Sequence, residues 1–301
     1  MAASQRDLRR KIKSISGTKK LTQAMQMVAA SKMQKAIKSA EMSRDYSRLA
    51  WEIIQNIKSG ASIAEHPLLI ERPTKKILTV LITSNRGLCG GLNAQVIKKF
   101  SANINSNLDN KIDIKIITMG NKGKLFVSRY FKNLLIADFP SPDRIVEFSD
   151  ITALSKIILD DYQTKKIDHV SIFYNHFAST LKQEATQKQL LPIPADSSTD
   201  LETKKEVLNK KNTTNIEYKF EPDVKSILDT ILPEILKIQM LQISLESNAS
   251  EHSARMIAMK NATDNAADLI DDLTLTYNSI RQAAITKEIS EISAGAEALR
   301  A

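Results

Sequence analysis

The last third of the chain carries a long apolar repeat that no isolated helix could bury. Read from Leu245 in alternating steps of four and three residues, the repeat reaches Ala284, and ten of its twelve positions are apolar. A spacing of about 3.5 residues is typical of a coiled-coil seam, whereas a helix lying on a globular core shows a broader apolar stripe. The seam therefore predicts a long helix over residues 223–301 that requires a partner helix.

The first 60 residues supply that partner. Apolar residues recur there at steps of three and four, and Gly60 and Pro67 mark the end of the pattern. Residues 1–40 contain ten Lys or Arg and one acidic residue, whereas the C-terminal helix carries more acidic than basic residues. Because opposite charges favour helix pairing, the sequence predicts that residues 1–60 and 223–301 form an antiparallel two-helix coiled coil.

Residues 74–195 show a different pattern, in which short β-rich runs alternate with helical ones. This alternation predicts a Rossmann-like, three-layer α/β domain with a largely parallel sheet. The expected strands are 77–83, 112–119, 134–137, 167–174 and an antiparallel strand at 181–190; the expected helices are 92–108, 122–130 and 151–163. Residues 196–215 are polar and predict a mobile loop, and Pro233 predicts a kink or short break at 229–233.

Charge and cysteine content limit the function classes. The net charge is +9 over 301 residues, so an acidic partner is expected, either nucleic acid or protein. A single cysteine, Cys89, excludes an internal disulfide. No run of 18 uncharged apolar residues is present, so the sequence predicts no transmembrane helix.

Two glycine-rich turns resemble phosphate-binding loops only in position. Gly87–Gly91 follows the first expected strand but has the order G-x-x-G-G, and Gly120–Lys124 lacks the spacing of a Walker loop. The four histidines are scattered, and Cys89 has no neighbouring ligand in the sequence. The sequence therefore predicts no catalytic residue, no cofactor and no metal site.

Several stretches of the chain resemble the γ subunits of F-type ATP synthases. They are residues 12–15, 18–25, 27–33, 82–93, 251–256 and 281–288, with Glu291, Gly295 and Ala296 following the last of them. In that family the terminal helices form a shaft inside a hexamer of α and β subunits. The α/β domain of the family sits on the ring of c subunits, beside the ε subunit.

The resemblance implies a non-catalytic rotor shaft that couples proton flow to ATP synthesis. It also implies peripheral association, through the c-ring, with the cytoplasmic face of a bacterial inner membrane, and no binding of nucleic acid. The residues expected to contact the α/β hexamer are Met25, Lys32, Arg281, Gln282, Thr286 and Glu288; those expected to contact ε and the c-ring are Ile216, Glu217 and Tyr218. A basic coiled-coil scaffold, or a nucleic-acid-binding protein with a Rossmann-like domain, is the alternative.

Overall fold

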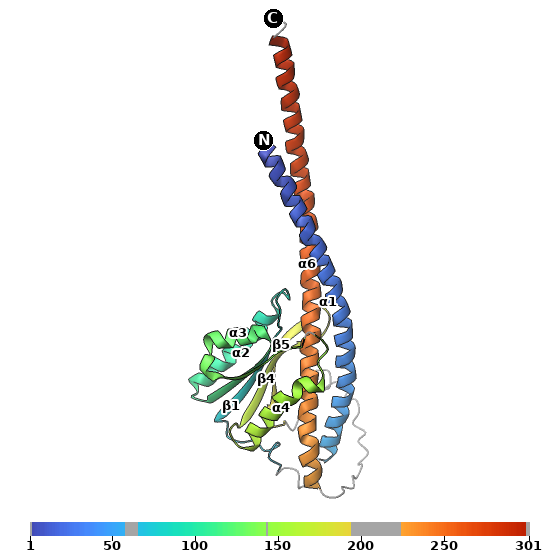
Figure 1. Ribbon diagram of the computed structural model, residues 1–301. Helices are drawn as coiled ribbons and strands as arrows, with labels where there is room; N and C mark the ends of the chain where they lie inside the picture. The colour runs from blue at the N-terminus through green and yellow to red at the C-terminus, as the bar shows by residue number, and fades with distance from the viewer. Residues whose placement is uncertain (1, 58–65, 143, 194–223, 299–301) are drawn as a thin grey trace. The chain divides into compact units, whose positions relative to one another are not determined.

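The computed structural model describes residues 2–57, 66–142, 144–193 and 224–298. The chain divides into two compact units: unit 1 combines Met1–Ala30 with Arg255–Ala301, and unit 2 comprises Ser31–Ala254. Two long helices, α1 (Ala2–Ile57) and α6 (Val224–Ala298), run through both units (Figure 1). The loop expected at 196–215 lies outside the described residues.

Unit 1 is an antiparallel pair formed by parts of α1 and α6. Gln5 Nε2 donates to the Ile280 carbonyl oxygen at 3.4 Å, and Thr263 Oγ1 donates to Thr22 Oγ1 at 2.7 Å. In both pairs the residue numbers add to 285, so one register holds along the pair and the two helices run in opposite directions. The antiparallel pairing predicted from the seam is confirmed.

Small and flexible side chains occupy buried positions of unit 1. Ala29 on α1 and Ala266 on α6 are both buried, with 1% and 6% of their surface exposed. Met259, another residue of the α6 seam, is also buried. A seam lined by Ala and Met provides apolar contact without bulky interlocking side chains. The pair is therefore held by a narrow apolar strip, with most of each helix surface facing outward.

Unit 2 contains a five-stranded mixed sheet with the order β3-β2-β1-β4-β5. Strands β1 (Lys76–Ile82), β2 (Asp113–Met119), β3 (Leu135–Phe139) and β4 (His169–Phe177) are parallel, and β5 (Gln183–Leu191) pairs antiparallel with β4. Strand β1 lies at the centre, and six of its seven residues are buried. All five strands were predicted within a few residues, including the antiparallel last strand.

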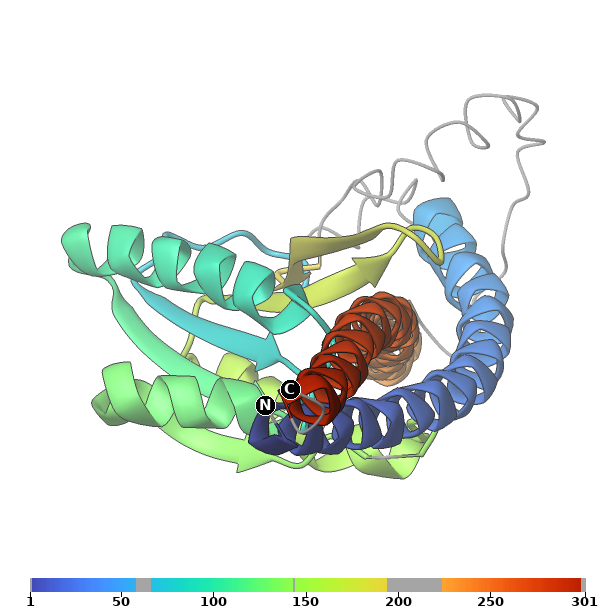
Figure 2. The same cartoon turned by 90° about the horizontal axis from the view of Figure 1, so that it is seen from above.

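Helices cover both faces of the sheet in unit 2. Helices α2 (Leu92–Asp109) and α3 (Asn121–Tyr130) lie together on one side, as Figures 1 and 2 show. They pack on the sheet through a cluster that contains Val96, Phe100 and Val127. A second cluster joins the other face to α4 (Phe148–Gln163) and to the part of α6 within this unit. The predicted three-layer α/β fold is therefore confirmed.

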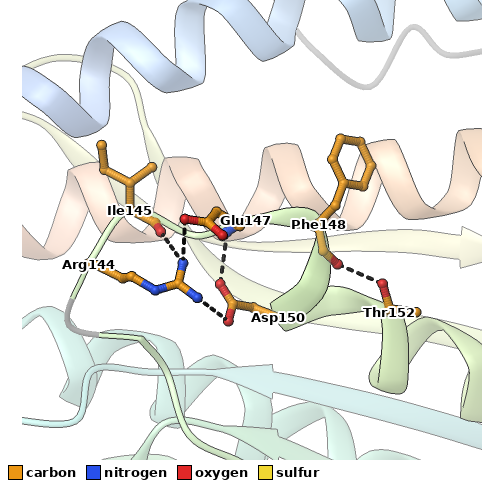
Figure 3. A network of polar contacts seen from close by, with 6 residues as sticks. All are labelled: Arg144, Ile145, Glu147, Phe148, Asp150 and Thr152. Atoms are coloured by element: carbon orange, nitrogen blue, oxygen red, sulfur yellow. Dashed lines mark hydrogen bonds and ion pairs between the residues drawn. The ribbon is translucent and has the colours of Figure 1, made fainter.

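Helix α4 begins three residues earlier than predicted because acidic side chains cap it. Glu147 and Asp150 form a reciprocal capping box, in which each side chain bonds the other residue's backbone N–H. Arg144 donates to the Asp150 carboxylate at 3.0 Å and pairs with Glu147 at 3.1 Å (Figure 3). The usual sequence signal for a capping box is Ser or Thr followed three residues later by Glu or Gln. The pair of acidic residues found here does not match that signal, so the start of α4 was predicted too late.

Helix α6 continues through Pro233 without a break. Proline removes one backbone hydrogen bond at a cost of about 3 kcal/mol in a helix interior. Here the neighbouring Leu232 and Leu236 are fully buried in the core. His66 Nε2 also lies 3.0 Å from the Asp229 carboxylate, one turn before the proline. Tertiary packing therefore offsets the lost bond, and the break expected at 229–233 is absent.

Candidate partner-binding surfaces

The end of α6 extends beyond any possible partner in α1. Because paired residue numbers in unit 1 add to 285, Ala283 lies opposite Ala2, and the positions from Ile285 onward have no described residue of α1 opposite them. Every side chain described from Ile285 to Ala298 is exposed. We call residues 285–298 the overhang. It is a single helix with no packing partner among the residues described in unit 1.

An apolar stripe runs along the overhang. Ile285, Ile289 and Ile292 are 48%, 60% and 67% exposed, and their spacing of four and three residues places them on one face of the helix. The three isoleucines form a small apolar stripe on one face of the helix, exposed to water in the chain alone. Ile289 and Ile292 were not predicted as site residues, although their spacing repeats that of the seam.

Two of the four C-terminal site residues predicted from the sequence, Thr286 and Glu288, lie in the overhang, and Arg281 and Gln282 lie just before it. Arg281, Gln282, Thr286 and Glu288 are all exposed. Lys287 is exposed as well, and its ammonium lies 3.6 Å from the Glu291 carboxylate, one turn further along. A guanidinium next to an amide provides planar, directional donors suited to a carboxylate.

The predicted N-terminal site residues lie on α1. Met25 is half-buried and Lys32 is exposed. Between them, the α1 residues Met27 and Val28 are 63% and 58% exposed, whereas Ala29 faces the seam. This stretch of α1 therefore presents apolar and basic side chains outward. Ile216, Glu217 and Tyr218 lie outside the described residues.

The turn after β1 is held by its own side chains. Asn93 Oδ1 accepts from the Ser84 backbone N–H at 3.1 Å, while Asn93 Nδ2 donates to Ser84 Oγ at 2.7 Å and to Cys89 Sγ at 3.2 Å. Ser84 Oγ in turn donates to the Arg86 carbonyl oxygen at 2.6 Å. Asn93, in the first turn of α2, therefore fixes the conformation of this glycine-rich turn.

The backbone N–H groups that begin α3 are also bonded within the chain. They donate to Asn85 Oδ1, the Ser84 carbonyl oxygen and Thr83 Oγ1, from residues 121, 122 and 123 respectively. A phosphate-binding loop needs such groups to point at the ligand. In α3 these donors instead bond the residues that directly follow β1. The hydrogen bonds therefore hold the start of α3 against the end of β1.

Metal-binding clusters and membrane-spanning helices are absent from the described ranges. No group of three His, Cys, Asp or Glu side chains there could hold a metal ion. Within the same ranges, none of the helices combines the length and apolar character needed to cross a membrane.

The whole chain matches known proteins. A family model described as ATP synthase matches residues 4–299. The "ATP synthase gamma chain" of Legionella pneumophila strain Corby is 39% identical over 302 residues, covering 99% of this chain and 100% of the relative. That of Psychrobacter cryohalolentis is 38% identical over 297 residues, covering 99% of each chain. The chain belongs to the ATP synthase γ-chain family.

Solved structures agree with membership of the γ-chain family. A chain from the central stalk and c-ring structure of the Tetrahymena thermophila mitochondrial ATP synthase is 26% identical, with a TM-score of 0.62, and the match covers 80% of this chain and 99% of that one. A chain from the Euglena gracilis mitochondrial enzyme has a TM-score of 0.66 at 18% identity, covering 99% of this chain and 95% of that one, and supports the fold. As a γ chain, the protein is a subunit of an ATP synthase.

Proposed function

We propose that this chain is the central rotor shaft of an F1Fo ATP synthase and that it carries no active site of its own. The observation that carries the proposal is the antiparallel pair of α1 and α6 with its exposed overhang, in a chain of the γ family. A long, narrow helix pair with an apolar stripe at its end fits a sleeve formed by other subunits. A nucleic-acid-binding or scaffold role is not favoured by the family match.

The proposed mechanism is a rotating bias on three equivalent sites. Catalytic sites of identical sequence are equivalent in a symmetric sleeve, but an asymmetric shaft contacts each of them differently, so each adopts a different conformation. The overhang supplies such asymmetry, because only α6 extends there and its isoleucines occupy one face. Turning the shaft then moves each site through the same series of conformations.

The division of labour along the chain follows from this proposal. Residues 1–60 and 223–301 would form the shaft, and residues 74–195 the foot that binds the ring of c subunits and ε. We place Met25, Lys32, Arg281, Gln282, Thr286 and Glu288 at the α/β hexamer, and Ile216, Glu217 and Tyr218 at ε and the ring. The chain would be held peripherally at the cytoplasmic face of a bacterial inner membrane.

Reconstitution tests the rotor proposal. The pure chain is expected to hydrolyse no ATP, and to assemble with α and β subunits into a 3:3:1 complex. With the hexamer fixed to a surface, a bead attached to unit 2 should rotate in one direction when ATP is added. Hydrolysis by the pure chain, or a complex that hydrolyses ATP while the bead does not turn, would contradict the proposal.

A further inference from the structure

One face of α6 in unit 2 carries a line of buried polar side chains. Gln242, Glu246, Ser250 and Ser253 follow one another at steps of four, four and three residues, which places them on the same side of the helix. All four are buried, and the two serines have no exposed surface. We call these four residues the polar ladder. Buried polar groups need bonding partners. Glu246, Ser250 and Ser253 find theirs on β4, β5 and the turn between them. Gln242 bonds Glu246 through Nε2, and its Oε1 has no partner among the described residues.

Glu246 is the centre of the polar ladder. Its Oε2 lies 2.7 Å from His176 Nδ1 on β4, and its Oε1 accepts from Gln242 Nε2 at 2.8 Å. Within the described part of the chain, Glu246 is the one carboxylate side chain among the buried residues. A buried carboxylate is expensive to desolvate unless its oxygens are bonded. Both oxygens of Glu246 are bonded, so its position relative to β4 is tightly defined.

The two serines extend the contact to the end of the β4–β5 hairpin. Ser250 Oγ donates to the Asn175 carbonyl oxygen at 2.9 Å. Ser253 Oγ donates to the Thr180 carbonyl oxygen at 2.6 Å and accepts from Gln183 Nε2 at 3.4 Å. The ladder therefore binds the last part of β4, the turn and the start of β5, where Figure 1 shows this hairpin beside α6.

The polar ladder differs in kind from the contact that precedes it. From Leu228 to Leu245, α6 packs on the sheet through apolar side chains of the larger core cluster. Apolar burial is non-directional, whereas hydrogen bonds weaken steeply when the donor angle changes. The ladder ends at Ser253, and unit 2 ends at Ala254. It is therefore a directional contact of α6 with the sheet close to the point where the helix enters unit 1.

We infer that the polar ladder is the joint that prevents α6 from turning about its own axis against the α/β sheet, with Glu246 and His176 as its central positioning residues. The inference rests on the proposed rotor function. In a rotor, torque applied to the foot must reach the shaft, and α6 connects the two covalently. A joint built from a bonded carboxylate resists twisting where apolar packing alone would yield.

Torsional stiffness measures this joint directly. In a complex reconstituted with α and β subunits, a bead is attached to a single cysteine at Lys98→Cys, an exposed position of α2, with Cys89→Ser as background. The hexamer is fixed and the complex is stalled without nucleotide. The variance of the bead angle should rise at least about twofold in Glu246→Gln, because the carboxylate offers an acceptor oxygen to each of His176 and Gln242, whereas the amide keeps only one.

Two further variants separate the joint from general stability. The double variant His176→Glu with Glu246→Lys reverses the positions of the acidic and the basic side chain. It should restore most of the stiffness, since a carboxylate and a basic group again face each other and Gln242 can turn its amide to accept. Glu184→Gln is the matched control, because Glu184 lies opposite His176 on β5 but is exposed; it should leave the variance unchanged. Ser253→Ala should raise the variance of the bead angle less than Glu246→Gln does. If Glu246→Gln does not assemble, Ser253→Ala provides the test instead.

The outcomes distinguish the two proposals. If the wild-type bead does not rotate with ATP, the rotor function fails and the joint fails with it. If the wild type rotates, yet Glu246→Gln and Ser253→Ala have the wild-type variance, the rotor stands and the joint is refuted. A lowered melting temperature with unchanged variance, or a reversed pair that rescues nothing, also refutes the joint, because Glu246 then serves the fold alone.

Discussion

Gly120 lies between β2 and α3, and its position leaves no room for a side chain. Its φ is +100°, and a Cβ atom added there would stand 2.0 Å from the Thr83 carbonyl oxygen. The close approach allows the N–H groups of α3 to bond the end of β1. A glycine at this point is therefore a requirement of the strand-to-helix junction, which the sequence motif alone showed only as a turn.

We predict that Gly120→Ala lowers the free energy of unfolding by about 2–3 kcal/mol, because it combines a disfavoured backbone conformation with a clash against backbone atoms. Gly17→Ala is the matched control: Gly17 lies in α1 with nothing within 4 Å of its added Cβ. That change should stabilise the helix by about 0.5–1 kcal/mol. Urea unfolding of both variants checks this, and equal midpoints would contradict it.

His169, the first residue of β4, gives unit 2 a dependence on pH. Burial lowers the pKa of His169 below 6.5, and its hydrogen bond with Gln189 only partly opposes that shift. No partner for the buried Nδ1 exists among the described residues, so a proton added there would be unsatisfied. Below pH 6.5 the histidine is therefore protonated in the unfolded chain but stays neutral in the folded chain. The free energy of unfolding falls as the pH falls towards the lowered pKa.

We predict that the melting temperature of the wild type falls more between pH 7 and pH 5 than that of His169→Gln. Glutamine keeps a polar side chain at this position but cannot gain a proton. Thermal melts across the pH range provide the measurement. Parallel curves for the two proteins would show that His169 is not the source of the acid sensitivity.

Arg281 is predicted to matter for assembly and not for folding. It is exposed on α6, so Arg281→Ala should leave the melting temperature of the chain unchanged. In the reconstituted complex it should weaken assembly or slow ATP turnover, because a charged pair that is partly buried on assembly is commonly worth about 2–5 kcal/mol. Lys287→Ala, at an exposed pair on the same helix, is the control and should have the smaller effect. A variant that melts early yet turns over normally would assign Arg281 to the fold.

At the scale of helices and strands, the register of unit 1 offers a direct test. Ile12 and Leu273 have numbers that add to 285, and both are partly buried. In a Cys89→Ser background, Ile12→Cys with Leu273→Cys should form an intrachain disulfide efficiently. Ile12→Cys with Ser290→Cys should not form one, because Ser290 lies 17 residues beyond Leu273 on α6, which is about 26 Å along the helix. Cross-linking of the second pair would refute both the register and the overhang.

Periodicity predicted the elements of this fold well because each obeys a local rule. The buried strand β1 is a continuous apolar run, and the turn residues between elements separate the runs. Helix α4 was misplaced at its start because its cap uses Glu147 and Asp150, with Arg144 adding a contact that lies outside the helix (Figure 3). Such a cap depends on side chains meeting in space, which spacing alone does not reveal.

The polar ladder escaped the sequence analysis for a different reason. Glu246 follows the seam residue Leu245 directly, at a position that a coiled-coil pattern leaves off the seam, and Gln242 is a polar residue where the seam would continue. In unit 2, however, every residue of α6 from Ile238 to Ser250 is buried. A helix buried on all sides normally reads as apolar on all sides, and this one does not. Only the packing of the sheet against α6 shows that these polar side chains are interior.

At the scale of the whole molecule, the two units differ in how their backbones are protected. Strand β1 is central and its residues are buried, whereas the overhang is a solitary exposed helix. Amide hydrogen exchange should therefore be slowest in β1 and its neighbours, and fastest in α6 beyond Ile285. Adding α and β subunits should slow exchange in the overhang and leave β1 unchanged. Equal protection of the overhang before and after assembly would argue against a sleeve around it.

The register of unit 1 also sets the order in which the protein can be made. Gln5 bonds a residue 275 positions later, and Thr22 one that is 241 positions later. At a synthesis rate of about 5–20 residues per second, the first helix waits roughly 10–50 s for its partner to leave the ribosome. During that time its seam residues are uncovered, while the sheet of unit 2 has already been translated. During synthesis the sheet of unit 2 can therefore form first, and the pairing of α1 with the end of α6 comes last.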